Sequence, residues 1–116
     1  MKFSAVLLIV PDEDENRAVE ILKEAGATGI TILKGKGLRH NERKTFLGLG
    51  LERKESLLLC VVEKQLAMRI LRTVKMQMKM EDLPGGGLAF SLPLGSVVGI
   101  GLAQMQAFRR EVEEEL

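Results

Sequence analysis

Hydrophobic residues follow two different patterns along this chain, and the change from one to the other predicts the order of its secondary structure. Mainly apolar runs at residues 3–10, 56–62 and 88–94 are typical of buried strands, since they are short and rich in branched side chains. A shorter run at residues 29–33 predicts a further strand, and residues 96–100 are predicted to be a last extended piece. We therefore expect extended structure in these segments.

Three other segments repeat apolar residues every three or four positions, as one face of a helix does. Asp12 and Glu15 form a capping-box pair that predicts where the first helix begins, and Gly26 predicts where it ends. The acidic residues 12–15 also complement the dipole of that helix. The apolar faces consist of Ala18, Ile21, Leu22 and Ala25 in the first helix, Leu66, Ala67, Ile70, Leu71 and Val74 in the second, and Met105, Phe108, Val112 and Leu116 in the third.

The elements follow one another as strand, helix, strand, and then as strand, helix, strand again. Two such halves predict an α+β fold of the ferredoxin-like βαββαβ type, a sandwich with an antiparallel sheet, followed by a C-terminal helix. A chain of 116 residues is expected to form a single domain over residues 1–116. Residues 34–54 lie between the halves and contain many charges and four glycines, so we expect a long loop there.

Residues 5–10 and 57–62 are apolar at every position, whereas a strand with one face in water alternates apolar with polar residues. Two helices cover only one face of a ferredoxin-like sheet, and a single terminal helix is small for the other face. We therefore expect a homo-oligomer in which sheets pack on sheets around a symmetry axis.

Charge and composition exclude several classes of partner. Seventeen basic and sixteen acidic residues leave a net charge of +1, which gives no electrostatic reason to bind nucleic acid, and the chain has no Trp or Tyr on which bases could stack. The single Cys60 cannot form a disulfide within the chain, and no apolar run reaches the ~20 residues that a membrane span needs. We expect a cytoplasmic protein that binds no nucleic acid and does not insert into a membrane.

Few side chains indicate catalysis or metal binding. His40 is the only histidine, which excludes a catalytic His pair or a multi-histidine metal site within one chain, and it is interpreted as an exposed loop residue. Cys60 lies in an apolar strand, where burial would raise its thiol pKa. The methionines at positions 76, 78 and 80 could bind Cu(I) but are better explained as filling gaps in the core. We predict that the protein is not an enzyme.

A glycine-rich turn precedes the last strand. Gly85, Gly86 and Gly87 lack Cβ atoms and can take positive φ, so their N–H groups can be directed at an anion or at a base edge. The same tripeptide is also a common connection between a helix and a strand. The turn by itself leaves both interpretations open.

Several motifs, in this order, resemble those of the P-II signal-transduction family of nitrogen regulatory proteins. Residues 26–32 (GATGITI) resemble the family's GxTGxTV strand entry, and residues 34–37 (KGKG) resemble its KGxG at the base of the flexible T-loop. Residues 85–90 (GGGLAF) resemble the B-loop GDGKIF, and residues 97–100 (VVGI) fall where the family has its closing VxRIR. The resemblance extends over nearly the whole chain.

The resemblance implies a homotrimer that binds an adenine nucleotide, ATP, ADP or AMP, in the clefts between neighbouring subunits. It also implies signal transduction in the regulation of nitrogen utilisation, with the loop at residues 37–54 contacting a target transporter or enzyme once a small-molecule effector has bound. The residues that would line the equivalent cleft are Gly29, Ile30, Thr31, Gly35, Gly37, Arg39, Gly85, Gly86 and Gly87.

Three cations of the family's phosphate site are replaced in this chain. Leu88 stands where the family has a Lys after the B-loop, and Gly99 and Gly101 stand where its closing strand has two Arg. Charged contacts to phosphate contribute about 1.5–3 kcal/mol each, so we expect a much lower affinity for a nucleoside triphosphate than is usual in the family. The cations of the loop that could replace them are Arg39, Arg43, Lys44, Arg53 and Lys54.

Two other functions fit the same fold. A metal-binding trimer of the CutA type would use His and Cys ligands, of which this chain has one each. A ligand-free interaction module would use apolar side chains of the loop, which could also pair as a short hairpin. Those side chains are Phe46, Leu47, Leu49 and Leu51.

Overall fold

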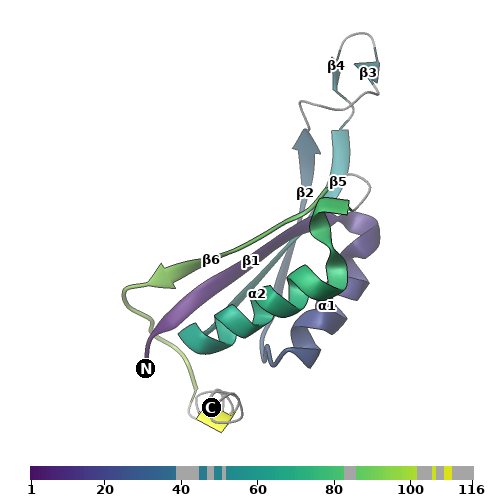
Figure 1. The fold of residues 1–116 in the computed structure, drawn as a ribbon. Coiled ribbons are helices and arrows are strands. Elements are labelled where there is room, and N and C mark those ends of the chain that lie inside the picture. The colour runs from purple at the N-terminus through teal and green to yellow at the C-terminus, as the bar shows by residue number, and fades with distance from the viewer. Residues whose placement is uncertain are drawn as a thin grey trace.

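The structure is a computed structural model that describes residues 1–38, 45–46, 49–50, 52–82, 86–101, 106 and 109–110. These residues form two layers, a four-stranded sheet with two helices packed on one of its faces (Figure 1). The sheet has the order β2-β5-β1-β6, and every neighbouring pair is antiparallel. Its strands are β1 (Phe3–Pro11), β2 (Thr31–Leu38), β5 (Glu52–Glu63) and β6 (Leu88–Leu94). The predicted α+β ferredoxin-like fold is confirmed.

The remaining elements connect these strands. Helix α1 (Glu15–Glu24) follows the 3-10 turn η1 (Asp12–Asp14), and helix α2 (Lys64–Met78) precedes the turn η2 (Met80–Asp82). A separate two-stranded ladder joins β3 (Thr45–Phe46) to β4 (Leu49–Gly50), so the short hairpin considered for the loop is present. It lies beyond the ends of β2 and β5 (Figure 1).

The hydrophobic core lies between the sheet and the two helices. Alternate residues of the central strands β1 and β5 point to the helices and are almost fully buried. Each large side chain buried in this way stabilises the fold by about 1.5–3 kcal/mol. The sheet contributes Val6, Leu8, Val10, Leu58, Cys60 and Val62 to this core, and the helices contribute Ala18, Ile21, Leu22, Leu66, Ala67, Ile70, Val74 and Met78.

The opposite face of the sheet is apolar but open. Leu33 pairs with Leu57, which pairs with Ile9, which pairs with Leu88, so these four side chains form one row across the face. Leu33 is 55% exposed and Leu88 is 53% exposed, and no described element covers the row. The prediction of apolar side chains on both faces is confirmed, and the described residues cover only one of these faces.

The strands beside the loop differ from their predicted bounds. β2 begins at Thr31, because Ile30 packs against the core instead of joining the ladder, and it continues to Leu38. β5 begins at Glu52, while β1 ends at Pro11, the partner of Glu55. The ends of β2 and β5 therefore project beyond β1 as a two-stranded stem. The sequence of the stem is polar and predicts a loop. It forms strands all the same, because strands that cover little of the core do not need apolar side chains.

Three further predictions were wrong or fall outside the described residues. The residue that caps α1 is Asp14 without a side-chain hydrogen bond, so Asp12 and Glu15 form no capping box. Residues 96–100 have no strand structure. Of the predicted C-terminal helix, Gln106, Arg109 and Arg110 are helical, and the residues of its apolar face lie outside the described residues.

Candidate functional site

A polar cluster of four side chains holds the base of the loop to the first helix. The Lys34 ammonium on β2 forms ion pairs with the carboxylates of Asp12 and Glu15, and it donates a hydrogen bond to Ser56 Oγ at 3.3 Å. Ser56 Oγ lies 2.7 Å from Glu15 Oε1 and 3.0 Å from Asp12 Oδ1, and its single proton serves one carboxylate at a time. β2, β5, η1 and α1 therefore meet at this cluster.

The cluster stabilises the charged form of each ionisable member. Hydrogen bonds from Lys34 and then from Ser56 lower the pKa of Asp12 below its ordinary value, and the same two donors lower the pKa of Glu15. Hydrogen bonds to the two carboxylates raise the pKa of Lys34. All three side chains stay charged at neutral pH, so the loop base is held by fixed charges.

Two of the predicted site glycines lie beside this cluster on β2, at the edge of the sheet. A hollow of about 320 Å³ lies next to Gly35, and Ile9, Leu33 and Leu57 supply its apolar floor. A Cβ atom added at Gly35 would meet no atom within 4 Å, whereas one at Gly37 would overlap the carboxyl group of Glu55. Gly35 thus leaves space for a ligand, and Gly37 leaves space for a side chain of the protein itself.

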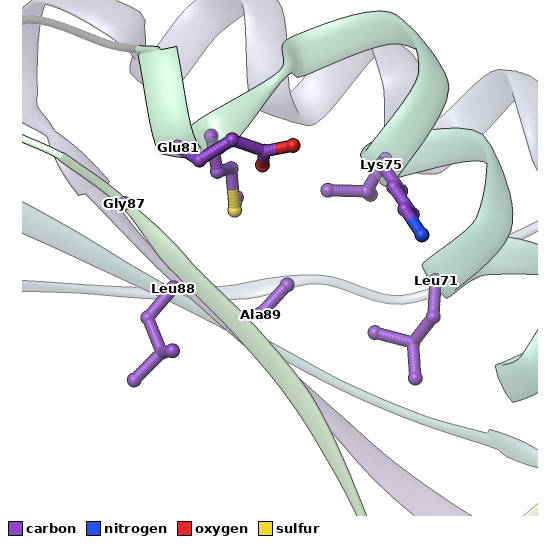
Figure 2. A pocket seen from close by; sticks show the side chains of 8 residues that line it. Leu71, Lys75, Glu81, Gly87, Leu88 and Ala89 are labelled. Atoms are coloured by element: carbon purple, nitrogen blue, oxygen red, sulfur yellow. The ribbon is translucent and has the colours of Figure 1, made fainter.

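The glycine turn borders a second hollow, of about 380 Å³, at the opposite edge of the sheet (Figure 2). Gly86 has a φ of 76°, a conformation that side-chain-bearing residues rarely adopt, so this position requires glycine. In Figure 2, Lys75 of α2 and Glu81 of η2 stand on the far side of the hollow from β6. The complete lining is Leu71, Val74, Lys75, Met80, Glu81, Gly87, Leu88 and Ala89.

The two hollows lie at the same end of the sheet but on different edges and faces: the one beside Gly35 opens on the face away from the helices, and the one at the glycine turn lies against α2 and η2. Leu33 of β2 and Leu88 of β6 belong to one row across the sheet, so they lie at the same position along the strand direction. Three strand spacings separate them, about 14 Å for strands 4.8 Å apart. Within one chain the loop base and the glycine turn therefore do not form a common pocket.

The remaining predicted site residues are spread more widely. Thr31 is exposed at the start of β2, four residues from Gly35, and Gly29 is exposed just before it. Ile30 is half-buried against the core. Arg39 and Gly85 lie outside the described residues, as do two further candidate cations of the loop, Arg43 and Lys44.

Sequence reasoning missed the four residues of the polar cluster. In the sequence, the helix terminus is a sufficient explanation for the carboxylates of Asp12 and Glu15, and Lys34 stands out only as part of a loop motif. Pairing of β2 with β5 places Lys34 opposite Ser56, and no spacing in the sequence indicates that register. The one signal in the sequence is the polar Ser56 at the start of an apolar run, because a hydroxyl buried with that strand needs a hydrogen-bonding partner.

Leu88, Gly99 and Gly101 occupy the three positions where the resemblance to the family expects a cation. The exposed side chain of Leu88 borders the hollow at the glycine turn. Gly99 has a φ of 103°, so an arginine there would be strained, and Gly101 is exposed. The loss of the first arginine is therefore accompanied by a backbone conformation that favours glycine.

Cys60 and two of the three methionines considered for metal binding are part of the hydrophobic core. Cys60 is buried, and burial raises the pKa of its thiol to about 11, as predicted. Met78 and Met80 are buried as predicted, while Met76 is exposed.

In the described part of the chain no three His, Cys, Asp or Glu residues are grouped so that they could hold a metal ion. Neither α1 nor α2 has the length and hydrophobicity needed to cross a bilayer. His40 lies outside the described residues.

Several solved structures share this fold. A PII-like signalling protein from Thermus thermophilus is 21% identical, with a TM-score of 0.60 over 81% of this chain and 88% of its own. CPII from Thiomonas intermedia, bound to ADP, AMP and acetate, is 14% identical, with a TM-score of 0.58 over 82% of this chain and 90% of its own. CutA1 from Pyrococcus horikoshii is 15% identical, with a TM-score of 0.65 over 93% of this chain and 96% of its own.

Identities this low establish the fold and do not separate signalling proteins from CutA proteins. No curated protein sequence matches the chain. The family model described as nitrogen regulatory protein P-II, however, matches residues 3–103, which include all of the sheet, both helices and the glycine turn. The chain therefore belongs to the nitrogen regulatory protein P-II family.

Proposed function

We propose that this protein is a regulatory homotrimer, without enzymatic activity, that binds a small effector between neighbouring copies. The observation that supports this most strongly is the position of the two hollows at the same end of the sheet and at opposite edges. In a closed ring of copies, the β2 edge of one chain comes close to the β6 edge of the next. Two incomplete pockets would then form one cleft.

The open face of the sheet supports the same assembly. Its central side chains, Leu7, Ile9, Leu57, Leu59 and Val61, are only half-buried in one chain. Apolar surface of this extent is unfavourable in water, at roughly 25 cal/mol for each Å². Three sheets that face a common axis would bury it and would also align the edges that carry the hollows.

We expect the effector to be an adenine nucleotide with few phosphates. Leu33, at the β2 edge of that face and 55% exposed, offers an apolar surface for a flat base, and the space above Gly35 admits it. Leu88, Gly99 and Gly101 supply no charge for a triphosphate. The similar CPII structure holds ADP and AMP, which favours these two as the first compounds to test.

The output is expected to pass through the stem of β2 and β5. Gly35 belongs to this stem, and the cluster around Lys34 attaches the stem to α1. An effector above Gly35 would contact the stem directly and change the population of loop conformations between residues 38 and 52. A target transporter or enzyme would then recognise the loop.

Light scattering and calorimetry test this proposal together. We expect a mass of about three times the 12.8 kDa of one chain, and AMP or ADP binding that Gly86→Val abolishes without changing that mass. Gly95→Val is the matched control, because a Cβ there meets no atom within 4 Å and the position lies beyond the far end of β6. A monomeric mass, or unchanged AMP binding by the Gly86 variant, would refute the proposal.

The similarity to CutA1 from Pyrococcus horikoshii, and to a CutA described as a periplasmic divalent cation tolerance protein from Archaeoglobus fulgidus, keeps metal binding as a second candidate. Copper or zinc titration calorimetry would separate the two. Heat from a metal ion combined with none from AMP would favour the CutA function, and the reverse result would favour the nucleotide.

A further inference from the structure

Helix α2 presents to solvent a face that carries only basic, methionine and amide side chains. None of the residues from Lys64 to Met78 is acidic. Successive residues of a helix are 100° apart, so the outward residues other than the exposed Gln77 fall within an arc of about 140°, opposite the side that packs in the core. We call this the basic face, and it consists of Lys64, Gln65, Met68, Arg69, Arg72, Lys75, Met76 and Lys79.

Two methionines on the basic face have no role in the core. Met68 is 52% exposed and Met76 is 76% exposed, whereas Met78 on the buried side is 2% exposed. Eight residues separate the exposed pair, about 12 Å along the helix axis. Methionine side chains are flexible and polarisable, and they adapt to apolar partners of different shape. A ligand of the basic face therefore has two apolar contact points with positive charge around them.

The basic face is a local feature, because the chain as a whole has a net charge of only +1. Residues 12–24, which include α1, contain six carboxylates and two cations. Glu63 at the start of α2 accepts hydrogen bonds from the N–H groups of Gln65 and Leu66, so its carboxylate belongs to the helix cap. The side-by-side helices in Figure 1 thus form a layer that is acidic over α1 and basic over α2.

We propose that the basic face of α2 is a docking surface for an acidic amphipathic helix of a partner protein. Such a helix carries apolar side chains seven or eight residues apart, which match the separation of Met68 and Met76, with carboxylates on either side. Complementary charge steers association and fixes register, while the two methionines supply the apolar contacts. Of the basic face only Lys75 also borders the hollow at the glycine turn, so the rest of this surface lies outside the proposed clefts between copies.

Other anionic partners fit the basic face less well. A membrane would meet only the outermost line of α2, because the apolar side of the helix is already buried in the core, and two methionines about 12 Å apart form no continuous wedge. Nucleic acid would gain nothing from the methionines and would find no aromatic side chain on α2 for stacking. A second copy of the chain would offer the carboxylates of its own α1, but the apolar side of α1 is buried in the core and could not contact the methionines.

Fluorescence titration with a synthetic acidic amphipathic peptide, with Leu at heptad spacing and Glu beside it, tests the proposal. The same peptide with Gln for every Glu is the control probe. We expect the Glu peptide to bind at least tenfold more tightly than the Gln peptide. The double variant K64E/R72E should weaken binding at least tenfold, and M68S/M76S severalfold.

The single variant K64E should also weaken binding, and its matched control is K23E, which makes the same charge change on the neighbouring helix α1. It should bind the Glu peptide as the unchanged protein does. Equal binding of both peptides, no binding of either, or equal weakening by K23E and K64E would overturn the proposal. So would binding to phosphatidylserine vesicles in preference to the peptide, or a mass that grows with protein concentration and falls with K64E/R72E.

Discussion

Lys34 on β2 lies opposite Ser56 on β5 and donates a hydrogen bond to its hydroxyl at 3.3 Å, although 22 residues separate the two in sequence. The pairing joins a strand that begins the T-loop motif of the family to a residue that is fully buried. Through this pair, the carboxylates of Asp12 and Glu15 hold the loop base to the first helix.

Replacing Ser56 with alanine removes a buried hydroxyl that contacts three charged side chains. We expect the free energy of unfolding to fall by about 1 kcal/mol, the usual net contribution of one hydrogen bond. Urea denaturation measures this. Ser91→Ala, at a half-buried position of β6, is the control and should change stability less. A Ser56 variant as stable as the unchanged protein would show that the cluster contributes little.

The cluster makes stability depend on pH in the acid range. Asp12 and Glu15 have pKa values below their ordinary 3.8 and 4.5 in the folded protein. A lowered carboxyl pKa stabilises the fold above the ordinary value, and this contribution is lost as the pH falls through the folded pKa. We therefore expect stability to decrease from about pH 4.5 downward, and Lys34→Met to flatten that decrease.

Melting temperatures between pH 3 and pH 6 check the sign of this effect. Lys23→Met on α1 is the control, because the charge it removes is outside the cluster. The raised pKa of Lys34 acts at the other end of the scale, since its stabilisation is present below pH 10.5 and lost above it. Identical acid profiles for the Lys34 variant and the unchanged protein would contradict the role of the ion pairs.

Two neighbouring glycines of the stem should respond differently to alanine. Gly35→Ala places a methyl group in open space, so we expect unchanged stability but weaker AMP binding, by tenfold or more. Gly37→Ala makes the Glu55 carboxyl group, the flexible end of that side chain, swing aside, so we expect only a small fall in the melting temperature. Calorimetry and thermal melting separate the two effects. Equal AMP affinity of Gly35→Ala and the unchanged protein would place the ligand elsewhere.

Restoring a cation at the glycine turn should change the preferred nucleotide. Leu88→Lys places an ammonium where the resemblance to the family expects one, and we predict at least tenfold tighter ATP binding with a smaller gain for AMP. Gly99→Arg should instead lower stability, because the φ of 103° is unfavourable for arginine. An equal gain for ATP and AMP would argue against a phosphate position near residue 88.

Cys60 should be inert while the protein is folded. Its burial and its pKa of about 11 leave little thiolate at neutral pH. We expect iodoacetamide to label it, as followed by mass spectrometry at pH 8, only in denaturant. Rapid labelling of the native protein would show that the core opens readily or that this strand is more accessible than the structure indicates.

The sheet and both helices could be predicted because burial imposes a period on the sequence. β6 has the predicted bounds, and the buried positions of α2 repeat at helical spacing. The stem of β2 and β5 could not be predicted in this way. Residues such as Lys36 and Lys54 pair across it, but they cover little core, and no hydrophobic pattern marks them as strand.

The candidate site was predictable only in pieces. Gly35 and Gly86 were identified from motifs, and each does border or precede a hollow. Their separation across the sheet follows from the strand order, which places β2 and β6 on opposite edges. The cluster around Lys34 depends on strand register and on the position of α1, and neither leaves a local signature in sequence.

Mixing two binding-defective variants tests most directly whether the cleft is shared between copies. Gly35→Trp would block the β2 side and Gly86→Val the β6 side, and neither alone should bind AMP. When the two are refolded together, a mixed trimer contains one cleft in which both sides are intact, so AMP binding should return. If the unchanged protein binds AMP but the mixture does not, both sides belong to one chain and the shared cleft is contradicted.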